Sequence, residues 1–231
     1  RLPSLSNLVE YWYFEWVYLV ARSSLSIMIP TDPQHIFGGS SMGIIDSLSQ
    51  RRTYYSINKE LPVSEDEVVA VVKKATELTP DAFNMHSQRV VVVFGDKQDK
   101  LWDAAFDAFG GAVAKEKTDS FKAGAGTILY FIDETTVASL QKKFPIYADN
   151  FPTWAQQSNG MLQISIWAAL RELKVAASLQ HYNPIIDKAV HALCDVPDNY
   201  TLVGEMPFGG IGADPDPKEP EDVSLRVKVV R

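Results

Sequence analysis

Two short apolar runs constrain the fold of this chain more than any other feature. Residues 89–94 read RVVVVF and stop at Gly95, and residues 127–133 read TILYFID. Runs of this length that are rich in β-branched residues are typical of strands buried on both faces. Residues 200–208 indicate a further strand, and segments with helical spacing of apolar residues lie between these runs. The sequence shows no internal repeat or linker, so it predicts an α+β fold with one sheet and helices packed around it.

The composition narrows the classes of protein to which the chain can belong. With 231 residues, 46% of them hydrophobic, the chain can bury a full core and is most simply one domain. Its 22 basic and 29 acidic residues give a net charge of -7, which argues against a general nucleic-acid or anionic-membrane surface. The single cysteine, Cys194, excludes an internal disulfide framework, and the four histidines lack the spacing of a zinc site. We therefore expect no metal and a reducing compartment: the cytoplasm, with the nucleus left open.

Residues 1–41 differ from the rest of the chain. They hold an aromatic cluster at 11–18, and Glu10, Glu15 and Arg22 interrupt any apolar window of the roughly 20 residues that a membrane span needs. A partial match to a secretory signal exists at 12–21. Met42 then opens an amphipathic stretch, MGIIDSLSQRR. We expect the functional domain to span residues 42–231, with residues 1–41 as an additional leader outside the fold.

The stretch after Met42 delivers two adjacent arginines. Residues 44–51 predict a short helix with three apolar side chains facing inward: Ile44, Ile45 and Leu48. A polar triplet ends it: Arg51, Arg52 and Thr53. Guanidinium groups present planar donor forks that match phosphate oxygens, and the threonine adds a hydroxyl, so this triplet suits an anion. An arginine pair is also common on solvated surfaces, and this interpretation would be preferred if the pair stood alone.

Two polar loops carry further side chains that can bind a ligand. The first precedes the strand at 89–94 and contains five such residues: Pro80, Asn84, His86, Ser87 and Gln88. The second, residues 180–184, reads QHYNP and begins with Gln180 and His181. An ordinary helix-to-strand connection would explain the first loop if it stood alone. Because several polar segments share this character, the sequence favours a binding site built from loops.

Two helices are clearly marked. Ser64 and Glu67 have the spacing of a capping box at the start of an amphipathic helix. In residues 153–173, apolar side chains cover nearly every side of a longer helix. A helix that is apolar all round must be buried all round, so we expect a second subunit to pack on it. The alternative is a central helix in the core of a monomer.

The end of the chain has two parts. Residues 209–222 are rich in glycine, proline and acidic residues and are typical of an extended arm. Residues 223–230, VSLRVKVV, alternate apolar and polar side chains, which predicts a strand. Such a strand needs a sheet edge, in its own chain or in a partner.

Nine short blocks occur in order along the chain. They are RRTYY at 51–55, LPVSEDE at 61–67, TPDAFN at 79–84, VVVVFGD at 90–96, LWD at 101–103, FKAGAGT at 121–127, FPIYADNFPTW at 144–154, ASLQHYNP at 177–184 and MPFGG at 206–210. In this order they resemble the nitroreductase family, and more narrowly its fungal and bacterial nitroreductase-like subgroup, which is linked in yeast to fatty-acid and oxidative-stress responses. The resemblance covers residues 42–231. It implies a nitroreductase-like fold with a central, mostly antiparallel sheet flanked by helices, in a homodimer that exchanges its C-terminal arms.

The resemblance also implies a cofactor and a set of residues. The family is FMN-dependent: each flavin lies between two subunits, is reduced by NADH or NADPH, and passes electrons to a nitroaromatic or quinone-like acceptor in a ping-pong cycle. By this resemblance the FMN phosphate and ribityl chain lie on the segment formed by Arg51, Arg52 and Thr53. The C-terminal basic pair that reaches the phosphate corresponds to Arg226 and Lys228.

The ring of the flavin is assigned to the two polar loops by the same resemblance. Asn84 falls on the asparagine that contacts the isoalloxazine and ribityl oxygens, and Gln180 and His181 fall on the loop whose backbone N–H lies by flavin N5. His86 replaces a glutamine that family members commonly have near the flavin edge. A histidine there could make the local hydrogen bonding pH-dependent.

The sequence carries no motif for a protein nucleophile, such as GxSxG, and no Cys/His pair at a plausible site. A bound flavin accounts for this, because the cofactor carries the electron chemistry. We therefore predict an FMN-dependent NAD(P)H oxidoreductase, with no catalytic side chain, that acts in oxidative-stress response. Two alternatives stay open: a flavin-binding regulatory protein in fatty-acid signalling with little turnover, and a structural α+β dimer without flavin.

Overall fold

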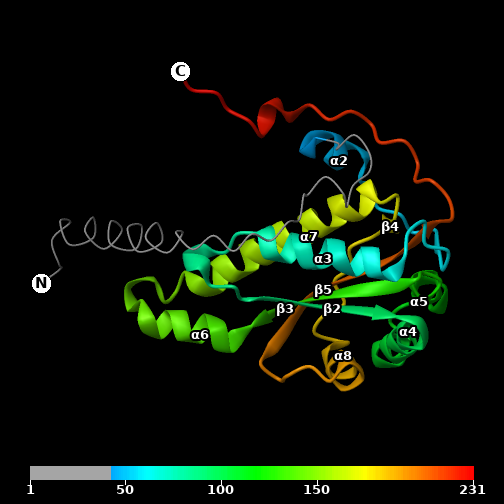
Figure 1. Cartoon of the computed structure of the whole chain (residues 1–231), viewed down its shortest axis with the longest axis horizontal. Helices are drawn as coiled ribbons and strands as arrows, with labels where there is room; N and C mark the ends of the chain where they lie inside the picture. Colours follow the sequence, from blue (N-terminus) through cyan, green and yellow to red (C-terminus); the bar gives the residue numbers. More distant parts are fainter. Residues whose placement is uncertain (1–42) are drawn as a thin grey trace, which may run out of the picture. The chain divides into compact units, whose positions relative to one another are not determined.

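The computed structural model describes residues 43–231, so the predictions for residues 1–41 lie outside it (Figure 1). These residues form one five-stranded sheet with the order β1-β5-β3-β2, and β4 pairs with β5. The strands are β1 (Ile57–Asn58), β2 (Gln88–Phe94), β3 (Gly126–Asp133), β4 (Ala176–Ala177) and β5 (Tyr200–Ile211). Every pair of these strands within residues 43–231 is antiparallel. The α+β prediction is therefore confirmed.

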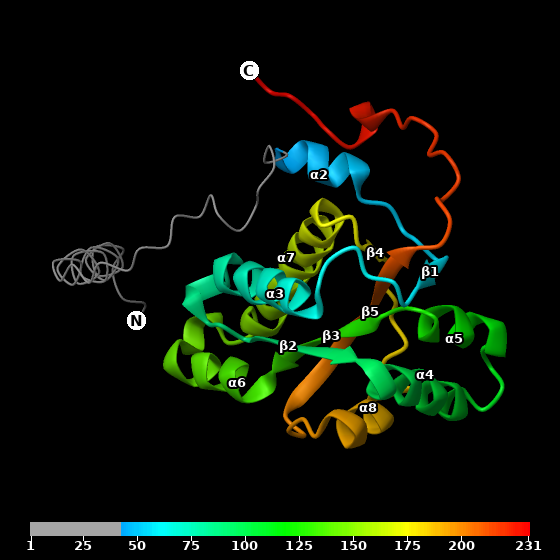
Figure 2. The same cartoon turned by 45° about the vertical axis from the view of Figure 1, so that its right-hand side comes forward.

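Helices cover both faces of this sheet (Figures 1 and 2). They are α2 (Ile44–Gln50), α3 (Glu65–Leu78), α4 (Gly95–Phe109), α5 (Lys115–Lys122), α6 (Glu134–Lys143), α7 (Phe151–Glu172) and α8 (Asp187–Cys194). Short 3-10 turns are η2 (Ala82–Asn84), η3 (Pro145–Tyr147) and η4 (Val223–Leu225). One apolar cluster joins α3 and α7 to the sheet, and another joins α4, α5 and α8 to its opposite face.

The central strand β3 explains why its sequence is apolar without alternation. Ile128 and Tyr130 pack in the cluster with α3 and α7, whereas Leu129 and Phe131 pack in the cluster with α4 and α8. Successive side chains of a strand point to opposite faces, and both faces are covered here. All of β3 is consequently buried.

The predicted helix signals are partly confirmed. Ser64 Oγ accepts from Glu67 N at 3.2 Å and Glu67 Oε2 accepts from Ser64 N at 2.9 Å, which completes the capping box of α3. α4 ends at Phe109, because Gly110 has a φ of 55° and terminates it. The sequence interpretation missed α5, whose charged sequence buries only Thr118 and Phe121.

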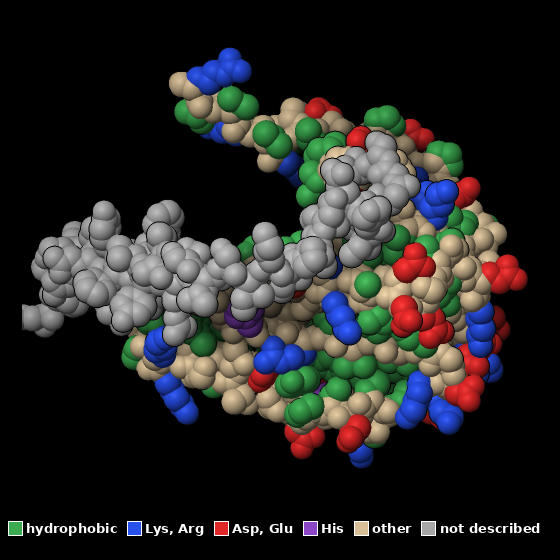
Figure 3. Space-filling view, in the orientation of Figure 1, with side chains coloured by type: hydrophobic (Ala, Val, Ile, Leu, Met, Phe, Trp, Pro, Cys, Tyr) green, Lys and Arg blue, Asp and Glu red, His purple; other side chains and the backbone are tan. Residues whose placement is uncertain are grey.

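Two predictions for the ends of the described chain are wrong. The inward face expected for α2 points outward: Ile44 and Ile45 are each 73% exposed, and Ser47 is buried instead, donating to Glu172 Oε1. The strand expected at 223–230 is a 3-10 turn followed by irregular chain, and Leu225 is 95% exposed on the projecting tail (Figure 3). An alternating segment forms a strand only against a sheet edge, and the tail pairs with none within residues 43–231.

Candidate functional site

The arginine segment lies over the C-terminal half of α7. The guanidinium carbon of Arg51 is 4.2 Å from the centre of the Trp167 ring, a cation–π contact. Tyr54 N donates to Ala177 O at 3.0 Å, which fixes the segment to β4. Arg52 Nη2 donates to the backbone oxygen of Asp216, in the extended segment that leads from β5 to the C-terminal tail at 223–230. Burial, and secondarily the charge of Arg52, lower the pKa of Arg51, so the pair concentrates positive charge at a partly desolvated position.

A third arginine stands beside this segment. Arg171 Nε donates to Gln50 O at 3.2 Å, and its guanidinium carbon lies 5.8 Å from the centre of the Tyr54 ring. Its Nη1 is buried and has no hydrogen-bond partner among the described residues. An unpaired buried donor on a cation is costly, and an anion at this position would satisfy it. Sequence reasoning missed Arg171, although it lies four residues after Trp167 and so on the same side of the helix.

The second polar loop joins the arginine segment through β4. β4 contacts Tyr54, and the chain continues from it to Gln180. Gln180 N donates to Glu205 O at 2.7 Å, and Glu205 N donates back to Gln180 O at 3.0 Å. His181, the next residue, is exposed. The structure thus brings the predicted phosphate segment and the predicted N5 loop together around one short strand.

The first polar loop is held at the opposite end of α7. Phe83 stacks on Trp154 with ring centres 5.7 Å apart, and Ser158 Oγ donates to Pro80 O at 2.8 Å. Asn84 and His86 are both exposed. The packing therefore fixes the backbone of this loop and leaves its two predicted site residues accessible.

The same loop carries backbone strain. Phe83, Asn84 and His86 have φ values of 55°, 52° and 53°. A residue other than glycine held at positive φ costs about 1–3 kcal/mol and persists where the surroundings enforce it, often at functional sites. The strain agrees with a loop whose polar side chains are held for a ligand.

The two halves of the predicted site are far apart in one chain. Trp154 carries the Phe83 loop and Trp167 carries Arg51. These tryptophans are separated by 13 residues of α7, which at about 1.5 Å per residue is about 20 Å. Within one subunit the arginine segment therefore lies beside the Gln180 loop, and the loop with Asn84 and His86 lies about 20 Å away along α7.

The C-terminal basic pair lies on the exposed tail. Arg226 Nη2 is 2.7 Å from Glu221 Oε1, and both Arg226 and Lys228 are exposed. The tail follows β5 and runs outside the helices toward α2 (Figures 1 and 2). Within the described chain, Arg226 thus forms its ion pair with Glu221, a residue close to it in the sequence.

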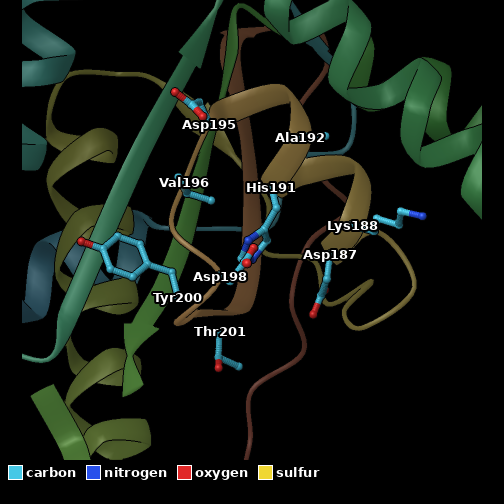
Figure 4. A pocket seen from close by; sticks show the side chains of 9 residues that line it. All are labelled: Asp187, Lys188, His191, Ala192, Asp195, Val196, Asp198, Tyr200 and Thr201. Carbon is cyan, nitrogen blue, oxygen red and sulfur yellow. The ribbon is translucent and has the colours of Figure 1, made fainter. Parts of the chain in front are cut away.

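A separate pocket of about 610 Å³ lies between α8 and the start of β5 (Figure 4). Its lining is Asp187, Lys188, His191, Ala192, Asp195, Val196, Asp198, Tyr200 and Thr201. This lining includes none of the residues predicted to hold FMN. Within residues 43–231, acidic, histidine and cysteine side chains form no group of three that could hold a metal ion, and no helix is long and apolar enough to cross a membrane.

Comparison with known proteins identifies the family. The sequence profile described as the Nitroreductase family matches residues 48–210. Nitroreductase FRM2 of Saccharomyces cerevisiae is 37% identical over 177 residues, which are 75% of this chain and 91% of that protein. The chain belongs to the nitroreductase family. This confirms the predicted resemblance and makes the protein an oxidoreductase of the nitroreductase type.

Solved structures agree with the nitroreductase fold. Nitroreductase CinD from Lactococcus lactis, solved in complex with chloramphenicol, is 40% identical, with a TM-score of 0.78, over 82% of this chain and 100% of that chain. CinD has also been solved with nicotinic acid and with 4-nitrophenol. A Desulfovibrio desulfuricans protein solved with FMN is 17% identical, with a TM-score of 0.61, over 83% of this chain and 99% of that chain, and supports the fold alone.

This nitroreductase holds an acidic residue, Glu205, inside its core, and sequence reasoning did not single it out. Glu205 lies in β5, is fully buried, and accepts from Tyr182 N through Oε2 at 3.0 Å. Its Oε1 has no hydrogen-bond partner among the described residues. The available signal was a lone carboxylate inside the apolar run at 200–208.

Proposed function

We propose that this nitroreductase is an FMN-dependent NAD(P)H oxidoreductase that reduces nitroaromatic or quinone-like acceptors as a homodimer. The observation that carries the proposal is the cationic segment beside β4. Arg51 and Arg52 precede the strand contact, and Arg171 adds a buried donor without a partner. This segment adjoins the loop at Gln180, so phosphate and ring contacts can belong to one ligand.

The donors of this segment fit the phosphate of FMN. Arginine forks match phosphate oxygens in pairs, and the hydroxyl of Thr53 adds a further donor. Arg51 is held in place by Trp167, which lowers the cost of ordering its side chain on binding. When bound, FMN supplies the two-electron carrier that the chain lacks. The described residues then have to hold it, exclude water and admit an aromatic acceptor.

The loop at 180–182 offers one backbone amide to the ring. Glu205 accepts the N–H of Gln180 through its backbone oxygen and the N–H of Tyr182 through Oε2. The amide of His181 lies between these two engaged amides. We assign the predicted contact with the N5 side of the flavin to this amide.

A second copy of the chain would complete the site. Several large apolar residues are exposed: Ile44 and Ile45 on α2, Met161 on α7 and Leu225 on the tail. Burial of such residues drives association. About 20 Å separates the two segments along α7. In our proposal, the Asn84 loop of one subunit and the arginine segment of the other contact the same FMN. The tail with Arg226 and Lys228 would then cover the partner.

The ligands of CinD support the choice of substrates. Chloramphenicol and 4-nitrophenol are aromatic compounds with a nitro group, and nicotinic acid resembles the nicotinamide of NAD(P)H. We extend these ligands to this chain as acceptor and donor. A cytoplasmic location and a role in oxidative-stress response belong to the same proposal and rest on the subgroup resemblance.

An absorption spectrum and a turnover assay test the proposal. Purified protein should show flavin bands, or gain them on addition of FMN, and should oxidise NADH or NADPH when 4-nitroquinoline N-oxide is supplied. A colourless protein that takes up no FMN would contradict the proposal. Bound flavin without acceptor-dependent oxidation would favour the regulatory alternative.

A further inference from the structure

Glu205 is placed to control the loop that the proposed function assigns to the flavin ring. Three hydrogen bonds connect this one residue to residues 180–182: its O accepts from Gln180 N, its N donates to Gln180 O, and its Oε2 accepts from Tyr182 N. The first two belong to an antiparallel bridge that any residue could form. The third hydrogen bond needs the side chain of Glu205, so the carboxyl fixes the loop at Tyr182, the residue after His181.

Among the described residues, no basic group acts on this carboxyl to balance a negative charge. Tyr182 N donates to it from the loop, and Asp187 of α8 repels the carboxylate. Leu129 is the partner of Glu205 on β3 and is apolar. Burial has the largest effect on the pKa of Glu205 and raises it. The Tyr182 N–H lowers this pKa and the charge of Asp187 raises it, and the result is a pKa of about 8. Oε1 is buried without a partner, and a neutral carboxyl tolerates this position far better than an anion does.

We propose that Glu205 is a positioning residue for FMN: its buried carboxyl holds the His181 amide in place through the Tyr182 N–H, and a negative charge on the carboxyl displaces the loop because the buried Oε1 has no partner. A carboxylate at this site would have to draw water or move toward solvent, and the Tyr182 bond would move with it. It would also place a negative charge beside a ring that gains electrons. This inference rests on the proposed function for the position of the flavin, whereas the titration of Glu205 does not.

The titration can be measured without FMN. In the apoprotein, the variant Glu205→Gln keeps an oxygen for Tyr182 N–H but cannot ionise. Because the folded parent retains its proton while the unfolded chain loses it, parent stability relative to the variant falls between the ordinary value of 4.5 and about 8. The ratio of the two folding constants should therefore change by up to about tenfold per pH unit in this window and level off above it.

Two further variants keep the apoprotein test decisive. Glu77→Gln makes the same chemical change at an exposed residue and should follow the parent at every pH. Asp187→Asn removes the repelling charge and should move the upper end of the window to lower pH. Parallel pH profiles for the parent and Glu205→Gln would overturn the inference.

FMN binding tests the positioning role. The dissociation constant and midpoint potential of FMN would be measured at about pH 6 and about pH 9, on either side of the carboxyl titration. We expect the parent to bind FMN about tenfold or more weakly at the higher pH, with an additional fall in potential that Glu205→Gln does not show. Equal changes in parent and variant would overturn this inference alone. A parent that binds no FMN at either pH would overturn the proposed function, and the apoprotein profiles would still report whether Glu205 titrates.

Discussion

The strand β3 and the C-terminal tail both carry apolar patterns that predict strands, but they have different structures. β3 lies between β2 and β5 and is buried along its whole length. The tail at 223–230 alternates apolar and polar residues, yet it forms a 3-10 turn and irregular chain with Leu225 and Val230 exposed. The difference shows that an apolar pattern specifies a strand only when the chain also supplies the neighbouring strands. Within residues 43–231 the tail pairs with no strand, and we propose that its partner is a second subunit.

The functional site divides in the same way. The arginine segment and the Gln180 loop lie together within one chain, because β4 accepts a hydrogen bond from Tyr54 and leads directly to Gln180. Asn84 and His86 stay at the other end of α7. Each half of the site is fixed locally, and in our proposal a second subunit joins them.

The largest effect is expected in the sheet core. Trp102 is 1% exposed, donates from Nε1 to Thr127 Oγ1 at 3.0 Å and packs on Phe121. Trp102→Ala should lower the free energy of unfolding by about 3–5 kcal/mol, since it removes a large buried side chain and leaves a cavity. Leu225→Ala on the tail should change it by less than about 0.5 kcal/mol. Denaturant unfolding of both variants measures the contrast, and similar losses would break it.

The next effect concerns the cationic segment. Arg52→Ala should weaken FMN binding by about 1.5–3 kcal/mol, because a charge-assisted phosphate contact is lost, while the fold is retained. Fluorescence titration with FMN gives the affinity, and circular dichroism checks the fold. Lys142→Ala removes an exposed positive charge on α6 and serves as the control. Equal FMN affinity in Arg52→Ala and its parent would refute the assignment of Arg52.

Removal of the tail should weaken the proposed homodimer. A chain that ends at Asp222 lacks five exposed apolar residues: Val223, Leu225, Val227, Val229 and Val230. If they pack on the partner, the dissociation constant of the dimer should rise about tenfold or more. Sedimentation over a range of concentrations measures this constant. An unchanged constant would show that the tail does not cross.

The smallest effect is expected at the start of α3. Ser64→Ala removes the side chain that accepts from Glu67 N, and it should lower the free energy of unfolding by about 1 kcal/mol. Thermal unfolding detects this loss, and Ser139→Ala on exposed α6 is a control without an N-cap. A loss as large as that of Trp102→Ala would mean that α3 contributes more than its cap indicates.

The sequence predicted the elements whose signals are local. β2, β3 and the capping box of Ser64 and Glu67 were predicted because their residues specify them within a few positions. α5 was missed because it is charged and buries only two residues. β1 was missed because the strand is only two residues long. The face of α2 was predicted wrongly, since its apolar side chains have no partner within the described chain.

For the site, the sequence predicted residue types better than positions. Arg51 and Gln180 were assigned to one ligand by resemblance, and the structure brings their segments together. Arg171 and Glu205 were missed because their role depends on contacts with residues distant in the sequence. Arg171 contacts Gln50, 121 positions away, and Glu205 contacts Gln180, 25 positions away. Such contacts arise from the fold and leave little trace in a single sequence.

A mixed dimer tests the composite site most directly. Asn84→Gly removes the side chain but tolerates the positive φ of this position, and it would be combined in one dimer with a subunit carrying Arg52→Ala. If each FMN is held by Arg52 of one subunit and Asn84 of the other, the mixed dimer keeps one intact site and should bind one FMN tightly, while both parent variants bind FMN weakly. Weak binding at both sites of the mixed dimer would contradict the account, because it would place Arg52 and Asn84 of the same chain in one site.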